Sequence, residues 1–152
     1  MDGQFLYTQE QARSIVGISA ESLRHWRRLV PFLKGRSGKA ARFAFGEVLG
    51  LAVTAEVVGR FGISIGHVHE SIEALFQLLT QLPIVQPGSV VILHDSTSML
   101  LVSDIQVSSL ESKAAILIPL DPLIENLRMK LLQGLRLPPQ SVLPFYEEVA
   151  SR

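Results

Sequence analysis

The chain has 152 residues, enough for one domain or two small ones, and its 47% apolar share supports a packed core and excludes a disordered chain. Its longest apolar runs, such as residues 114–120, are far shorter than the roughly 18 residues of a membrane span. The first residues carry no secretory signal, so we expect a cytoplasmic protein without a membrane partner. There is no cysteine, which excludes disulfides, thiolate metal sites and cysteine nucleophiles.

The formal net charge of zero hides an uneven distribution. Residues 1–62 contain nine Lys/Arg and five Asp/Glu, whereas residues 63–152 contain five and nine. Within residues 13–43, eight basic residues accompany a single acid, Glu21. Such a concentration is expected of a surface that binds a polyanion, although a solvated basic face gives the same pattern.

Two short helices joined by a glycine turn are expected near the N-terminus. Thr8 and, three residues later, Gln11 form a capping-box pattern for the first helix, which Gly17 ends. Ser19 is expected to cap the second helix, and Pro31 should stop it because proline restricts the residue before it. Helix, tight turn and helix in this order are typical of helix-turn-helix proteins.

The second helix separates an anchoring face from a charged face when its residues are placed about 100° apart. Leu23, Trp26 and Val30 share the apolar face, with Arg27 at its edge. We therefore expect Trp26 in the core rather than stacked on a base. The opposite face holds most of the charge, with Ser22 at its flank: Glu21, Arg24, His25 and Arg28.

A basic loop follows this helix. Its glycines and serine predict a turn, which four cations surround: Lys34, Arg36, Lys39 and Arg42. Short alternation over residues 42–45 predicts a small strand. A basic two-stranded loop directly after a helix-turn-helix is a wing, so we expect both the helix and the loop to contact nucleic acid.

Two longer helices are expected next. The first begins near Gly46 and ends near Arg60. Ser64 is expected to cap the second helix. The apolar residues of that helix repeat at spacings of three and four: Ile65, Val68, Ile72, Leu75, Phe76, Leu79 and Leu82. Pro83 and Pro87 then mark a boundary.

The last part of the chain changes character. The expected elements are a hairpin of strands at 89–95 and 98–104, a third strand at 114–119 and a helix at 120–134 capped by Asp121. Strands this apolar are expected to be buried on both faces. A segment of about 65 residues without disulfides or a structural metal is too small to bury them by itself. A second copy is the simplest supplier of the missing surface, so we expect a homodimer. The alternative is that the strands pack on the helix of residues 65–82 of the same chain, which would leave a monomer.

Residues that suggest catalysis or a metal have simpler interpretations. His94, Asp95 and Ser96 are adjacent on an expected turn, where they rarely converge like a catalytic triad, so a polar turn is the better interpretation. His67 and His69 are two residues apart on a helix and do not share a face, whereas a metal site needs three or four converging ligands. We therefore expect no enzyme activity, no metal and no cofactor.

Five ordered features identify a family resemblance. They are Tyr7-Thr8 at the first helix, Gly17-Ile18-Ser19 in the turn, Leu23-Arg24-His25-Trp26 in the second helix, Arg42-Phe43 after the basic loop, and Phe61-Gly62-Ile63-Ser64 before the fourth helix. In this order and spacing, over roughly residues 6–82, they resemble the MerR family of winged helix-turn-helix transcriptional regulators. Pro83 and Pro87 interrupt the chain where the family continues into a long dimerisation helix, and no cysteine is present for soft metals.

The resemblance implies a role for each residue by position. The recognition helix, residues 19–30, would enter the major groove, and the wing, residues 34–43, would contact phosphates. Groove-facing residues would be Glu21, Ser22, Arg24 and His25, with Arg28 near the backbone and Arg36, Lys39 and Arg42 in the wing. The full set expected to bind DNA is Ser19, Glu21, Ser22, Arg24, His25, Arg28, Arg36, Lys39 and Arg42.

The expected fold is therefore α+β. Residues 1–82 would form a MerR-like winged helix-turn-helix domain. Residues 83–152 would add a small segment of hairpin, strand and helix for dimerisation, or for an unknown small-molecule or protein effector. The expected function is sequence-specific binding of double-stranded DNA by a dimeric transcriptional regulator. Two alternatives stay open: a DNA-architectural or excisionase-like protein on the same winged fold, and a protein-interaction module of the antitoxin or adaptor kind.

Overall fold

The structure, a computed structural model, describes residues 5–82, 85–94, 98–102 and 114–135. It combines helices with two small antiparallel sheets, in agreement with the α+β class. The helices are α1 (Gln9–Val16), α2 (Ala20–Leu29), α3 (Pro31–Lys34), α4 (Phe45–Ala55), the π-helix η1 (Glu56–Arg60), α5 (Ile65–Gln81) and α6 (Leu120–Leu135). The strands are β1 (Leu6–Thr8), β2 (Arg42–Ala44), β3 (Val90–His94), β4 (Ser98–Val102) and β5 (Ala115–Pro119).

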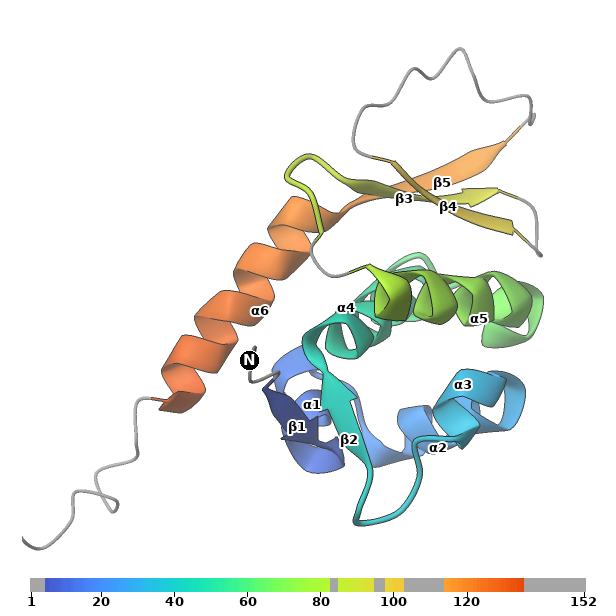
Figure 1. Ribbon diagram of the computed structural model, residues 1–152. Coiled ribbons are helices and arrows are strands. Elements are labelled where there is room, and N and C mark those ends of the chain that lie inside the picture. The colour runs from blue at the N-terminus through green and yellow to red at the C-terminus, as the bar shows by residue number, and fades with distance from the viewer. Residues whose placement is uncertain (1–4, 83–84, 95–97, 103–113, 136–152) are drawn as a thin grey trace, which may run out of the picture.

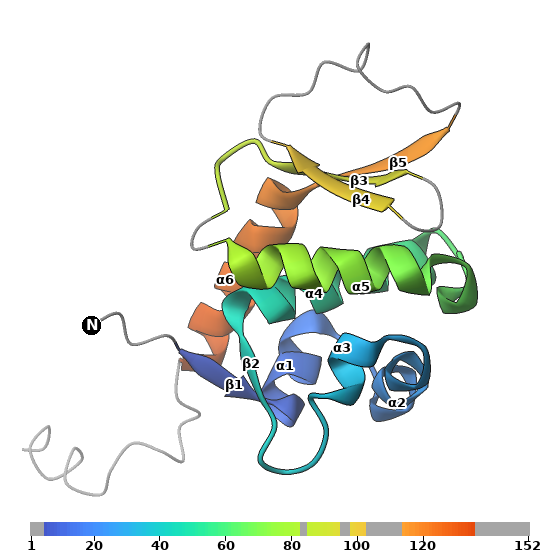
Figure 2. The same ribbon diagram turned by 45° about the vertical axis from the view of Figure 1, so that its right-hand side comes forward.

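The C-terminal elements pack on the N-terminal helices. The sheet of β3, β4 and β5 lies against α5, while α6 runs down the side of the helical body (Figure 1). There α6 contacts α4 and α1, and Figure 2 shows it behind α5 from a second angle. Two domains divided near residue 83 stay a prediction.

The predicted caps of the first two helices are confirmed. The Gln11 amide donates to Thr8 Oγ1 at 3.2 Å, and the Thr8 amide donates to Gln11 Oε1 at 2.9 Å, so the capping box is complete. Gly17 ends α1 in the left-handed region with φ of 82°, which a side chain would disfavour. The Ser22 amide donates to Ser19 Oγ at 3.0 Å and fixes the start of α2.

The core is centred on α4 and α5. The predicted α5 stripe is buried from Ile65 to Leu79, whereas Leu82 lies beyond the helix end and is partly exposed. Gly50 of α4 faces the ring of Phe76, so the absence of a side chain there allows the two helices to approach closely. The apolar face of α2 also enters this core, and Trp26 is buried as predicted.

The second sheet has the strand order β4-β3-β5, with both pairs antiparallel. The central strand β3 is buried on both faces, as predicted, because the consecutive residues Val91, Ile92 and Leu93 are all buried. The same prediction is wrong for the edge strand β5, where Ile118 is buried but Leu117 is 40% exposed. Edge strands lack a neighbour on one side, which accounts for the difference.

The predicted two-stranded loop within residues 34–43 is not formed. Strand β2 pairs instead with β1, which precedes α1 in the chain, and Tyr7 lies opposite Phe43. Residues Pro31–Lys34 form the short helix α3, because proline is well suited to the first position of a helix. The loop that enters β2 therefore does not form a hairpin of its own, although the predicted cations lie on this loop and at the start of β2.

Two further helix boundaries differ from the prediction. The helix expected from Gly46 to Arg60 changes to π-helical hydrogen bonding at Glu56, and the Phe61 amide donates to the Glu56 carbonyl at 3.0 Å. Helix α6 begins at Leu120, so Asp121 lies within its first turn rather than at the cap. The Asp121 carboxylate accepts the Gly88 amide at 2.9 Å, a contact between segments distant in the sequence.

Some predictions fall outside the described residues: the Ser96-Thr97 turn, Pro83 and the tail beyond residue 135. None of the helices in the described part of the chain combines the length and apolar character that a membrane crossing requires.

Candidate nucleic-acid interface

The outer face of α2 presents cations to solvent. Arg24, His25 and Arg28 are exposed, as is Glu21 in the first turn. Within the described residues, no hydrogen bond or ion pair engages any of these four side chains. Leu23 and Trp26 fix the helix from its other side. Side chains held on an anchored helix without internal partners are available to a ligand.

The two serines of the predicted set have a structural role. Ser19 Oγ accepts the Ser22 amide at 3.0 Å and donates to Ser22 Oγ at 2.9 Å. Both hydroxyls therefore belong to the cap that starts α2. They remain near its solvent-exposed N-terminus, where the positive end of the helix dipole favours an anion.

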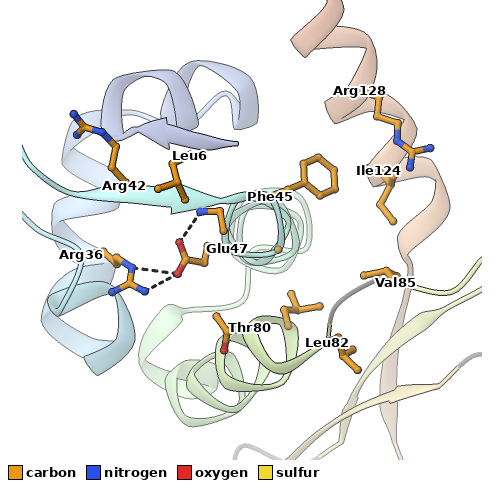
Figure 3. Close-up of a pocket in the computed structure, with 13 residues that line it drawn as sticks. Leu6, Arg36, Arg42, Phe45, Glu47, Thr80, Leu82, Val85, Ile124 and Arg128 are labelled. Atoms are coloured by element: carbon orange, nitrogen blue, oxygen red, sulfur yellow. Dashed lines mark hydrogen bonds and ion pairs between the residues drawn. The ribbon is translucent and has the colours of Figure 1, made fainter. Parts of the chain in front are cut away.

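Arg36 is engaged inside the fold. Its Nη2 lies 2.7 Å from Glu47 Oε1 and its Nε donates to the same oxygen at 3.1 Å. Glu47 is buried, and its Oε2 accepts the Ala44 amide at 2.8 Å at the start of α4 (Figure 3). The Arg36 guanidinium also lies 5.1 Å above the Phe32 ring. Arg36 therefore anchors the loop, although its side chain keeps 40% exposure.

Lys39 is exposed on the same loop, and Arg42 is the exposed first residue of β2. Arg42 Nη1 donates to the carbonyls of Lys39 and Ala41, at 3.0 and 2.9 Å, and so stiffens the chain before β2. Figure 3 shows the Arg42 side chain on the other side of β2 from Arg36 and Glu47. The two arginines thus face different surroundings, which their spacing in the sequence did not reveal.

Sequence reasoning missed Arg13 and Arg27. The Nε atoms of both are buried without a hydrogen-bond partner in the described structure. Burial lowers the pKa of the Arg27 guanidinium below its ordinary value. For Arg27 the signal was present, since the helical layout places it at the edge of the apolar face. Arg13 had no signal beyond its membership of the basic stretch.

A cavity of about 620 Å³ lies where α6 meets the helical body. Phe45, Leu82, Val85 and Ile124 line its apolar part, and the Arg36–Glu47 pair lies at its far end (Figure 3). Its size is that of small-molecule sites.

Within the described part of the chain, no three His, Asp or Glu side chains lie close enough together to coordinate a metal ion.

Comparisons of the chain with protein-family models, with curated proteins and with solved structures find no match. The case for function therefore rests on the geometry: an anchored helix with free outward cations, beside a stiffened basic loop.

Proposed function

We propose that the chain is a transcriptional regulator that binds double-stranded DNA in a sequence-specific manner, with α1, its turn and α2 as a MerR-like helix-turn-helix and with the basic loop before β2 in the position of a wing. The observation that carries the proposal is the outer face of α2, where Arg24, His25 and Arg28 are exposed and without internal partners. Cations clustered on one face of a helix are the electrostatic pattern expected of a nucleic-acid-binding surface.

The dimensions of α2 suit the major groove. Its ten residues span about 15 Å, and the groove of B-DNA is about 12 Å wide and accepts a helix. Arg24 and His25 would reach base edges, while Glu21 would accept a hydrogen bond from a cytosine amino group. Arg28, Lys39 and Arg42 would contact phosphates. This division would supply sequence preference from the helix and affinity from the backbone contacts.

We also propose that the protein acts as a homodimer. Met129 and Leu132 are 50% and 60% exposed on α6, three residues apart and so on one helix face. A two-fold pair would place two α2 helices on one duplex and read a pseudo-palindrome. Sedimentation of the full chain at micromolar concentration should give a dimer. Changing Met129 and Leu132 to Glu should give a folded monomer, and a wild-type monomer would contradict the proposal.

The two alternatives predict different binding behaviour. A DNA-architectural protein would bind duplexes with no preferred sequence, and selection from random DNA would return no motif. A protein-interaction module would bind no duplex even at low salt. The proposed regulator should instead return a defined motif, with two related halves if it is dimeric.

The direct test changes Arg24 and Arg28 to Gln, one at a time. Each change removes a charge-assisted contact worth about 1.5–3 kcal/mol, so the Kd for the selected duplex should rise roughly 10- to 150-fold. Arg60→Gln is the matched control, because Arg60 is an exposed arginine at the end of η1 and belongs to neither the proposed DNA face nor the proposed dimer contact. Thermal unfolding should be the same for all three variants. Unchanged Kd values for the α2 variants would refute the assignment of this face.

A further inference from the structure

A second basic feature lies beside the outer face of α2 and is separate from it. A cavity of about 550 Å³, here called the Arg27 cavity, is bounded by α1, α2 and the loop that enters β2. Figure 2 shows that loop passing next to α1. Three cations and one carboxylate line the cavity, together with small and polar residues: Thr8, Gln9, Glu10, Arg13, Arg27, Gly38 and Lys39.

Arg27 is partly buried in this cavity without a countercharge. Its Nη2 donates to Gln9 Oε1 at 2.6 Å and to the Arg36 carbonyl at 2.7 Å, and both of these acceptors are neutral. Within the described residues no carboxylate pairs with Arg27, and its buried Nε has no acceptor. A cation removed from water without an anionic partner is costly, and an anion beside it would offset that cost.

Arg13 and Lys39 add to the positive charge from two other elements. The buried Nε of Arg13 has no acceptor in the described structure, and no hydrogen bond or ion pair engages the side chain of Lys39. Glu10 lines the same cavity but is exposed and forms no ion pair with either cation. The net charge of the lining is therefore positive, and the N-terminal end of α1 increases the positive potential there.

We propose that the Arg27 cavity is a phosphate-binding site, and that its phosphate belongs to the backbone of the bound duplex. The proposal deepens the proposed function and rests on it for the source of the phosphate, though not for the site itself. The guanidinium groups of Arg13 and Arg27 and the ammonium group of Lys39 belong to three different elements that line the cavity, and together they suit a tetrahedral oxyanion with several acceptor oxygens. The cavity lies beside the recognition helix, where backbone contacts fix the orientation of a protein on DNA.

The first arm of the test uses inorganic phosphate and the full chain without DNA. Nε–H resonances of Arg13 and Arg27 should shift on titration with phosphate at constant ionic strength, whereas sodium chloride should not move them. Lys39→Gln and Arg13→Gln should each weaken phosphate binding at least threefold, and Arg128→Gln should leave it unchanged. Arg27→Gln is avoided, because Arg27 also joins α1 to the loop. Absence of any phosphate-dependent shift would overturn the site.

The second arm uses the selected duplex. Arg13→Gln changes a residue of the cavity that the proposed function does not assign to DNA, and it should reduce the slope of log affinity against log salt by about one, as expected for the loss of one phosphate contact. If phosphate binds and both variants weaken it, but the salt slope for DNA is unchanged, the site takes free phosphate and the assignment to the DNA backbone is wrong. If wild type binds no duplex, the proposed function fails, while the phosphate arm still decides whether the site exists.

Discussion

Replacing Gly50 by Ala should destabilise the fold through one steric contact. A Cβ at this position would lie 2.5 Å from Cε1 and 2.8 Å from Cδ1 of Phe76. The Phe76 ring is fully buried and stacks on Phe32 with centroids 4.9 Å apart, so it has no free space into which to turn. Overpacking of a core by one methyl group typically costs about 1–3 kcal/mol. Because Phe32 belongs to α3, the disturbance should also reach the helix that follows α2.

Gly59→Ala provides the matched control. Gly59 is exposed in η1, and a Cβ there would meet nothing within 4 Å. That change should be neutral or should stabilise by about 0.4–1 kcal/mol through the entropy of the unfolded chain. The entropy gain is common to both variants, so the difference between them isolates the steric cost. Urea unfolding should place Gly50→Ala about 1–3 kcal/mol below Gly59→Ala. Equal stabilities would refute the close approach of α4 and α5.

Three further predictions follow from the site and the core. Glu47→Gln should lower the free energy of unfolding by about 1.5–3 kcal/mol, because it removes the charge that pairs with Arg36. Urea unfolding measures this difference, and an unchanged stability would contradict the prediction. The fluorescence of Trp26, the single tryptophan, should have its maximum at short wavelength and should resist quenching by acrylamide, with or without DNA. Strong quenching of this fluorescence by DNA would contradict the place of Trp26 in the core. Glu21→Ala and His25→Ala should each change the motif selected from random DNA, and an unchanged motif would show that they do not read bases.

Much of the N-terminal architecture could be predicted from the sequence because its signals are local. Thr8 and Gln11 lie within one helical turn, and the Gly17 turn and the Ser19 cap are likewise complete within a few residues. The apolar spacing of α2 placed Trp26 in the core for the same reason. Contacts set by neighbouring residues do not depend on how distant segments meet.

The features that the sequence did not reveal depend on distant contacts. Strand β1 has three residues, too few for a pattern, and its partner β2 lies beyond three helices. The Arg36–Glu47 pair joins a loop to a buried helix start, so Arg36 looked like one more wing cation. The unpaired Nε of Arg27 exists only because α1, α2 and the loop enclose it. Spacing in the sequence carries no information about such enclosure.

The most direct test of the central claim is the affinity of the full chain for its selected duplex as salt is raised, measured by fluorescence anisotropy. If Arg28, Lys39 and Arg42 of each protomer neutralise one phosphate each, roughly six counterions are released, and affinity should fall about 10³-fold between 50 and 200 mM salt. Failure to bind any duplex at 50 mM salt, or an affinity that does not change with salt, would contradict the account.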